Sequence, residues 1–211
     1  MNILAVDCCT KLTGVALRTD ENFCSEQKDL GRLQSRELPL MTERLLHENN
    51  LSWKNLDYIA LTNGPGYFTG IRVGASYATG LAYASGAKII PVSSLELLSK
   101  SYKSSKKILT MIYAGHGFIY AECEKFLEAG EYSHEFIKSW LDKTNKNSDV
   151  EIISDNPERI DLLNEKILQV NPNLSALIET ALQNINRAIN PLELKILYYR
   201  VPQGMNLERI D

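Results

Sequence analysis

The sequence Asn63-Gly64-Pro65-Gly66-Tyr67-Phe68-Thr69-Gly70-Ile71-Arg72-Val73-Gly74 decides the fold of this chain. Six of the twelve glycines lie between Gly64 and Gly86, so the backbone needs positions from which side chains are excluded. The apolar stretch 58–61 predicts a buried strand before the loop, and helical periodicity runs from about Thr69 to Ser85. A strand, a glycine loop and a helix in this order can hold a phosphate at the helix N-terminus.

Spacing excludes two common phosphate-binding loops. A Walker loop requires Gly, four residues and Gly-Lys-Ser/Thr, which does not occur, and a dinucleotide loop requires a glycine where Thr69 stands. Small residues instead recur every four positions along the helix, at Gly70, Gly74, Ala78 and Ala82. This ridge allows a close contact either with a partner helix or with the chain's own sheet.

Composition limits the class of protein. The 211 residues, 44% of them apolar, provide enough core for one large domain or two small lobes. A net charge of -3 argues against a dedicated nucleic-acid binder, which needs clustered Lys and Arg. The sequence has no leader pattern and no apolar run of membrane length, so we expect a cytoplasmic protein. The four cysteines lack a Cys-x-x-Cys spacing and the three histidines are scattered, which predicts reduced thiols and no metal site.

The chain opens with a predicted hairpin of strands 3–6 and 14–17, and its bend carries Asp7 and Thr10. Actin-like ATPases and sugar kinases present such an acid and hydroxyl to metal-bound phosphate. Asp7 and Thr10, together with Gly64 and Gly66, are therefore candidates for a phosphate loop or its remnant. The alternative is that both side chains only form hydrogen bonds with the turn backbone.

The remaining pattern predicts a two-lobe α/β protein. Further strands are expected at 21–27, 88–92, 108–113, 118–126 and 150–154, and further helices at 34–49, 93–100 and 174–189. The strand-turn-strand pattern at 108–126 repeats the opening hairpin and indicates an internal duplication. We expect a first lobe at 1–100, a second, reduced lobe at 101–189, and a tail at 190–211 that packs back on the first lobe.

Several stretches together resemble the bacterial TsaB (YeaZ) family. They are residues 3–10, Ser35-Arg36-Glu37-Leu38-Pro39-Leu40, the central glycine loop, and Val92-Ser93-Ser94-Leu95-Glu96, with weaker echoes at 117–120 and 198–200. The resemblance implies an actin-like (ribonuclease H-like) fold with mixed sheets flanked by helices. It also implies a role in making N6-threonylcarbamoyladenosine at position 37 of tRNAs that read codons starting with A.

The resemblance implies partners as well. The catalytic sibling TsaD and the ATPase TsaE are expected to join the chain, ATP and metal are expected on those subunits, and tRNA is expected to be reached through the complex. A homodimer of the isolated chain is left open. The chain departs from the family pattern at Cys8-Cys9, Gln34, Tyr67 and Tyr113, where Thr-Ser, His, Ser and Asp are usual. These departures weaken the expectation of a direct phosphate contact.

The sequence predicts no catalytic residue. Ser94 and Leu98 stand where the catalytic sibling has two metal-binding histidines, and 131–203 contains no glycine for an adenosine loop. We favour a non-catalytic subunit that binds TsaD, and the alternatives are an actin-like small-molecule phosphotransferase and a peptidase, which lacks a nucleophile and metal ligands. The expected partner surface lies on the two amphipathic helices and comprises Leu38, Met41, Leu45, Gly70, Gly74, Tyr77, Ala78 and Leu81.

Overall fold

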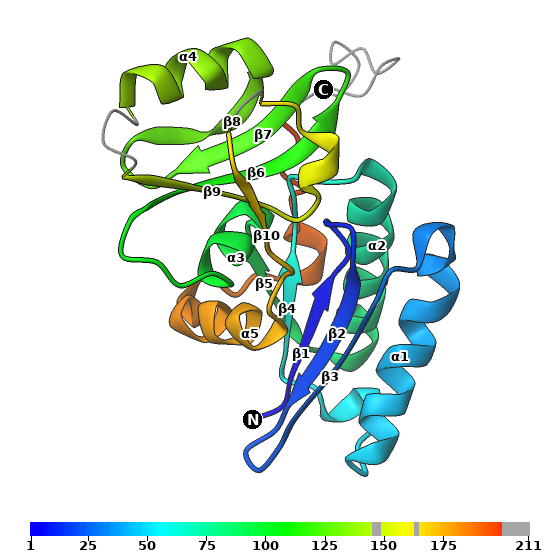
Figure 1. Ribbon diagram of the computed structural model, residues 1–211. Helices are drawn as coiled ribbons and strands as arrows, with labels where there is room; N and C mark the ends of the chain where they lie inside the picture. Colours follow the sequence, from blue (N-terminus) through cyan, green and yellow to red (C-terminus); the bar gives the residue numbers. More distant parts are fainter. Residues whose placement is uncertain (145–148, 163–164, 200–211) are drawn as a thin grey trace.

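The protein folds into two α/β lobes, one above the other in Figure 1. A computed structural model describes residues 1–144, 149–162 and 165–199. The strands are β1 (Ile3–Asp7), β2 (Thr13–Arg18), β3 (Phe23–Lys28), β4 (Tyr58–Thr62), β5 (Lys88–Val92), β6 (Lys107–Gly115), β7 (Phe118–Cys123), β8 (Leu127–Ser133), β9 (Val150–Ser154) and β10 (Ile167–Gln169). The α-helices are α1 (Gln34–Glu48), α2 (Phe68–Ser85), α3 (Ser94–Lys100), α4 (His134–Thr144) and α5 (Leu174–Gln183).

The first sheet has the strand order β3-β2-β1-β4-β5. Strands β1, β2 and β3 are antiparallel, whereas β4 and β5 run parallel to β1. Side chains alternate along β1, so Leu4 and Val6 join one buried cluster while Ile3 and Ala5 join another on the opposite face. Both faces of this sheet are therefore covered, which explains why β1 is apolar throughout.

The second sheet repeats the first. Its order, β8-β7-β6-β9-β10, places three antiparallel strands beside two parallel ones, as in the first sheet. A helix follows the third strand in each lobe, α1 after β3 and α4 after β8. The duplication predicted from the repeated strand-turn-strand pattern is confirmed, and with it the actin-like class of fold.

The second lobe is reduced between its two parallel strands. In the first lobe the 18-residue helix α2 connects β4 to β5, whereas in the second lobe the described part of the β9–β10 connection forms a short 3₁₀ turn, Pro157–Arg159. This difference removes the counterpart of α2 and leaves the carboxyl end of β9 facing the first lobe.

Helices α1 and α2 cover one face of the first sheet and α5 covers the other (Figure 1). Leu177 and Ile178 of α5 pack in the same cluster as Ile3 and Ala5, so α5 lies with the first sheet although it follows the second in sequence. The boundaries expected from the sequence assigned 101–189 to the second lobe. Helix α5 is nevertheless part of the core of the first.

Local boundaries differ from the sequence-based expectation at two places. The helix expected at 174–189 ends at Gln183, because the Asn184 N–H closes its last turn on backbone oxygens and a 3₁₀ turn follows at Ile185–Arg187. The strand expected at 118–126 ends at Cys123, because Lys125 adopts a positive φ of 66° in a turn that leads into β8. Strand β8, strand β10 and helix α4 were not predicted.

The end of the described chain returns to the first lobe. Ile189 pairs with Ile89 at the edge of the first sheet, and the Leu197 N–H donates to the Asn63 oxygen over 2.8 Å. The tail contacts the first lobe as far as Tyr198, which packs against Phe68, whereas Tyr199 packs against Tyr120 of the second lobe. Residues 200–211 lie outside the described residues. Within the described chain, no helix combines the length and apolar character that a membrane crossing requires.

Candidate functional site at the junction of the lobes

The bend of the β1–β2 hairpin lies at the junction of the two lobes. The Asp7 carboxylate accepts hydrogen bonds from the Thr62 hydroxyl at 2.7 Å, the Cys9 N–H at 3.1 Å and the Thr10 hydroxyl at 3.2 Å. Asp7 is fully buried, and this burial raises the pKa of its carboxyl against the opposing effect of the three hydrogen bonds. Asp7 and Thr10 are thus brought together, but their hydrogen bonds hold the bend itself.

A second acid, Asp155, reaches the same bend from the second lobe. It follows β9, and its Oδ2 accepts the Lys11 N–H at 2.9 Å. Its other oxygen, Oδ1, is buried and has no hydrogen-bond partner within the described residues. Burial raises the pKa of Asp155 to about 6; the hydrogen bond from Lys11 opposes the rise and the nearby Asp7 adds to it. A carboxyl group from the second lobe therefore occupies a backbone N–H at the bend of the hairpin.

The glycine loop packs directly on the hairpin. A Cβ at Gly66 would overlap the carbonyl oxygen of Cys9, and one at Gly70 would overlap that of Cys8. The Tyr67 N–H donates to the same Cys9 oxygen at 2.9 Å. These glycines are needed because two backbone segments touch, which leaves no space between them for a phosphate group.

Gly64 has a different neighbour. It adopts a φ of 108°, and a Cβ there would lie 2.7 Å from the Leu197 oxygen of the returning tail. The predicted set of Asp7, Thr10, Gly64 and Gly66 therefore lies around one bend, where Asp7, Gly64 and Gly66 contact other parts of the chain and Thr10 lines a cavity.

A side-chain contact also connects the lobes. Across the junction, the Asn156 amide donates to the Tyr67 hydroxyl at 3.2 Å. Within the second lobe, the Arg159 guanidinium lies 5.5 Å from the centre of the Tyr113 ring. Asp155 and Asn156 were missed by the sequence analysis. The signal was present, because Asp-Asn-Pro directly follows a predicted strand and such a turn faces the carboxyl edge of the sheet.

Most of the expected partner surface lies inside this chain. Six of its residues are buried against the first sheet or its hairpin: Leu38, Met41, Leu45, Gly70, Gly74 and Ala78. A Cβ at Gly74 would lie 3.1 Å from the Cβ of Cys8. The ridge of small residues therefore packs on the chain's own sheet, which is one of the two explanations that the sequence left open. Tyr77 and Leu81 are half-buried and retain accessible surface.

An exposed groove runs between α1 and α2 on their outer side. It has a volume of about 440 Å³ and is lined by Ser35, Leu38, Pro39, Arg72, Val73, Ser76 and Tyr77. Pro39 and Ser76 are exposed, and Leu40 of α1 and Tyr83 of α2 are large exposed apolar side chains outside the groove. This outer face is the part of the two helices that a partner can reach.

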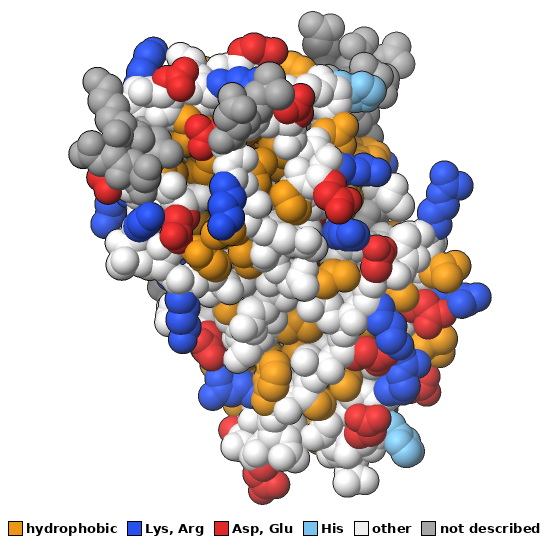
Figure 2. Space-filling model, viewed as in Figure 1, with side chains coloured by type: hydrophobic (Ala, Val, Ile, Leu, Met, Phe, Trp, Pro, Cys, Tyr) orange, Lys and Arg blue, Asp and Glu red, His pale blue; other side chains and the backbone are white. Residues whose placement is uncertain are grey.

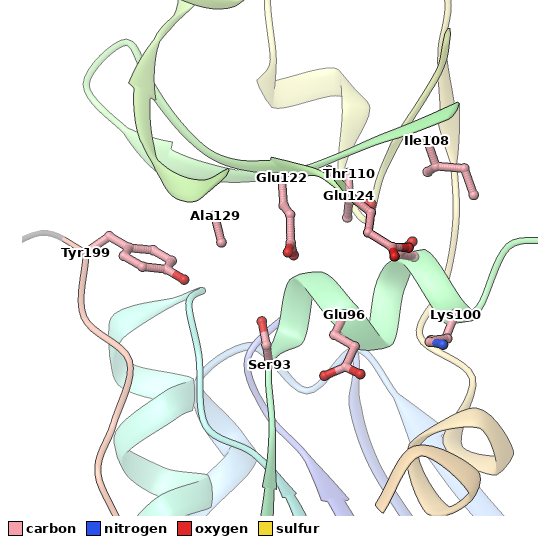
Figure 3. Close-up of a pocket in the computed structure, with 10 residues that line it drawn as sticks. Ser93, Glu96, Lys100, Ile108, Thr110, Glu122, Glu124, Ala129 and Tyr199 are labelled. Atoms are coloured by element: carbon pink, nitrogen blue, oxygen red, sulfur yellow. The ribbon is translucent and has the colours of Figure 1, made fainter. Parts of the chain in front are cut away.

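A separate pocket of about 320 Å³ lies between α3 and the second sheet (Figure 3). Glu122 points from β7 toward α3, while Ser93 points upward from the end of β5. Burial raises the pKa of Glu122, and repulsion from Glu96 and Glu124 adds to the rise. Over the described residues, no three His, Cys, Asp or Glu side chains are placed to hold a metal ion.

Comparison with known proteins supplies the context for this geometry. Residues 28–191 match the family model TsaD, tRNA N6-adenosine threonylcarbamoyltransferase. The chain is 32% identical over 103 residues to the Haemophilus influenzae tRNA threonylcarbamoyladenosine biosynthesis protein TsaB, covering 48% of this chain and 43% of that protein. It is 27% identical over 180 residues to the TsaB protein of Buchnera aphidicola from Acyrthosiphon pisum, covering 80% and 78%. The match thus spans less than half of the first relative and over three quarters of the second.

A solved structure has the same fold. The crystal structure of a Pseudomonas aeruginosa protein, described as similar to the peptidase YeaZ, superposes with a TM-score of 0.80 at 22% identity, covering 94% of this chain and 99% of that one. At this identity the likeness concerns the fold, and it includes both lobes.

Proposed function

Because the chain belongs to the TsaD family of tRNA N6-adenosine threonylcarbamoyltransferase domains, in which its relatives are TsaB (YeaZ) proteins, we propose that it is a non-catalytic subunit. In this role it supports transfer of threonylcarbamoyl to adenosine 37 of tRNAs that read codons starting with A. Its partner is the catalytic protein TsaD. The ATPase TsaE joins the complex, and ATP and metal bind to those partner subunits.

The observation that supports a non-catalytic role is that carboxylates of this chain already bind the backbone N–H groups of the hairpin bend. The Lys11 N–H is bound to Asp155, the Cys9 N–H is bound to Asp7, and the glycine loop touches the hairpin backbone. A phosphate group could bind the Lys11 N–H only by displacing the Asp155 carboxylate. The chain's own carboxylates thus occupy the N–H groups of the hairpin bend, which supports a role in which this subunit does not bind the substrate there.

We further propose that TsaD binds over the groove between α1 and α2. Half-buried Val73 and Tyr77 provide apolar surface there, and Arg72 and Tyr77 are residue types enriched in interface cores. The buried ridge of Gly70, Gly74 and Ala78 supports these helices from beneath and does not itself contact the partner.

A binding experiment with two matched variants tests this role. Ser76→Arg places a long charged side chain in the groove, and Ser139→Arg makes the same change at an exposed position of α4 in the second lobe. We expect Ser76→Arg to weaken TsaD binding at least tenfold and to reduce tRNA modification in the reconstituted system. Ser139→Arg should retain TsaD binding and tRNA modification. The two variants should melt at the wild-type temperature.

Two results would contradict the proposal. Equal TsaD binding by wild type and a folded Ser76→Arg variant would exclude the groove. ATP turnover by the isolated chain that is lost in Asp7→Ala would instead favour the small-molecule phosphotransferase.

A further inference from the structure

A larger cavity, of about 840 Å³, opens at the junction of the lobes beside the N-terminus of α2. Four segments line it: Thr10 and Lys11 of the hairpin, residues 29–34 before and at the start of α1, residues 67–70 at the start of α2, and Asn156 and Arg159 of the second lobe. Its volume is within the range of small-molecule sites, roughly 300–1,000 Å³. The proposed TsaD groove is lined by other residues.

The charges lining this cavity are mainly positive. Lys11, Arg32 and Arg159 come from three separate segments, and all three are exposed. Asp29 is the one carboxylate among the lining residues, so three positive charges less one negative charge leave a net charge of +2. No described Asp or Glu lies within ion-pair distance of these three cations. Their mutual repulsion favours the binding of an anion between them.

Helix α2 adds a further attraction for an anion. Its first turn, Phe68 to Gly70, lines the cavity, and no side chain caps this end, since Tyr67 forms no capping hydrogen bond. The helix has 18 residues, and its first N–H groups and macrodipole both favour negative charge at this end. The cations and the helix terminus thus act on the same volume.

Side-chain contacts on both lobes hold the walls of the cavity in place. Tyr67 is fixed by the Asn156 amide at 3.2 Å, and the Gln34 amide donates to the Thr13 hydroxyl at 2.8 Å. Arg159 lies over the Tyr113 ring, which holds its guanidinium at the lobe junction. Such contacts reduce the ordering cost of binding a ligand.

We propose that this cavity binds the phosphate group of a small ligand. The phosphate would lie among the Lys11, Arg32 and Arg159 side chains and the N-terminus of α2, and it would leave the Lys11 N–H bound to Asp155. Arg and Lys side chains with backbone N–H groups are the donors that phosphate oxygens require.

A small ligand fits better than an RNA backbone. On the face of the molecule drawn in Figure 2, Lys and Arg side chains are interspersed with Asp and Glu, without an extended area of one sign. RNA binding relies on many phosphate contacts spread over a positive surface. Here the positive charges converge on one cavity of a chain whose net charge is -3. The inference does not depend on the proposed role with TsaD.

Titration of the ¹⁵N-labelled full chain with inorganic phosphate and with AMP tests the site. We expect saturable shifts of the amide signals of residues 67–70 and of Lys11. The double variant Lys11→Gln/Arg159→Gln should bind both probes at least tenfold more weakly. The matched double variant Lys88→Gln/Arg187→Gln, which neutralises two exposed cations at the opposite end of the first sheet, should bind them as wild type does.

Three results would overturn the proposal. The first is the absence of saturable shifts at tens of millimolar phosphate and AMP. The second is equal weakening in the two double variants, which would indicate a general effect of charge. The third is binding of a tRNA stem-loop with no binding of either small probe, which would assign the positive charges to RNA. The amide spectra themselves report whether each variant remains folded.

Discussion

Two glycines at the start of α2 allow the helix to touch the β1–β2 bend. Gly66 and Gly70 stand where a Cβ would overlap the carbonyl oxygens of Cys9 and Cys8. The overlap is with backbone, which cannot rotate away as the end of a long side chain can. Replacing either glycine by alanine would therefore require the helix or the hairpin to move.

Gly70→Ala tests this close approach. We expect it to lower the free energy of unfolding by about 1–3 kcal/mol or more, as overpacked positions do, despite the higher helix propensity of Ala. Gly80→Ala in the same helix is the control, because its Cβ would meet nothing within 4 Å. The Gly80→Ala control should raise the free energy of unfolding by about 0.5–1 kcal/mol. Urea denaturation measures both, and equal effects would exclude the packing explanation.

Asp155 should make stability depend on pH. Its folded pKa of about 6 lies above the value of 3.8 for an unperturbed carboxyl, so between these values the folded chain holds a proton that the unfolded chain has released. Stability must then fall as pH rises from about 4 to about 6. The contribution is up to roughly 3 kcal/mol at about 1.4 kcal/mol per pKa unit.

Asp155→Asn should remove this contribution while keeping an oxygen to accept the Lys11 N–H. We expect the variant to be as stable as wild type near pH 4 and more stable near pH 7, in denaturation curves recorded across this range. The buried Asp7 and the half-buried Glu122 also have raised pKa values, so the difference between variant and wild type is the quantity to compare. A difference that does not change with pH would contradict the assignment.

At the scale of elements, the tail acts as an added edge for the first lobe. Ile189 exchanges hydrogen bonds with Ile89 at 2.8 and 3.1 Å, which covers part of the exposed edge of β5. Further on, Asn63 binds the tail twice, through its backbone oxygen to the Leu197 N–H and through its side-chain amide to the Lys195 oxygen at 3.0 Å. The glycine loop is therefore held by the hairpin on one side and by the tail on the other.

Leu197→Pro tests the contribution of the tail, because proline lacks the N–H that Asn63 accepts. Asn63 is buried, so we expect a loss of about 1–3 kcal/mol in the free energy of unfolding, the cost of an unpaired buried acceptor. Lys195→Ala keeps the backbone contacts at an exposed position and should change stability by less than about 0.5 kcal/mol. Chemical denaturation of the full chain distinguishes the two, and a neutral Leu197→Pro would show that the tail is not needed.

At the scale of the whole molecule, local pattern predicted a duplicated, two-lobe α/β protein, and the resemblance to a family supplied the actin-like class of fold. The apolar runs at 3–6, 58–61 and 88–92 and the repeated hairpin at 108–126 identified strands and a duplication, since burial on both faces leaves uninterrupted apolar sequence. Helices α1, α2 and α3 were predicted within about two residues of their observed ends. The amphipathic helix α4 and the short strand β10 were missed; the three residues of β10 are too few to show a period.

The interior of the site could not be predicted in this way. The contact between Lys11 and Asp155 joins residues 144 positions apart, and no periodicity encodes such a distance. The glycine ridge had two explanations with the same spacing, and the choice between them depended on what lies beneath α2. The return of α5 to the first sheet could not be predicted either, because its apolar stripe could pack against the sheet of either lobe.

The return of α5 makes the second lobe an insertion into the first. The chain leaves the first lobe after α3 and re-enters it before α5 at neighbouring points, since the Asn173 N–H donates to the Ser101 hydroxyl at 2.8 Å. The Gln27 amide holds Pro172 at 3.1 Å beside the same point. Leu177 and Ile178 then complete the core beneath Ile3.

We therefore expect residues 1–101 alone to lack a cooperative unfolding transition, because one face of their sheet is uncovered. Residues 1–102 joined by a short Gly-Ser linker to 172–211 should regain a cooperative transition, followed by far-UV circular dichroism in urea. Its stability should be lower than that of the full chain, because Leu95 and Leu98 of α3 lose their packing against Ile112 and Ile153. A linker variant carrying Leu177→Asp and Ile178→Asp is the control and should not fold. Cooperative folding of 1–101 by itself would refute the assignment of α5 to the core of the first lobe.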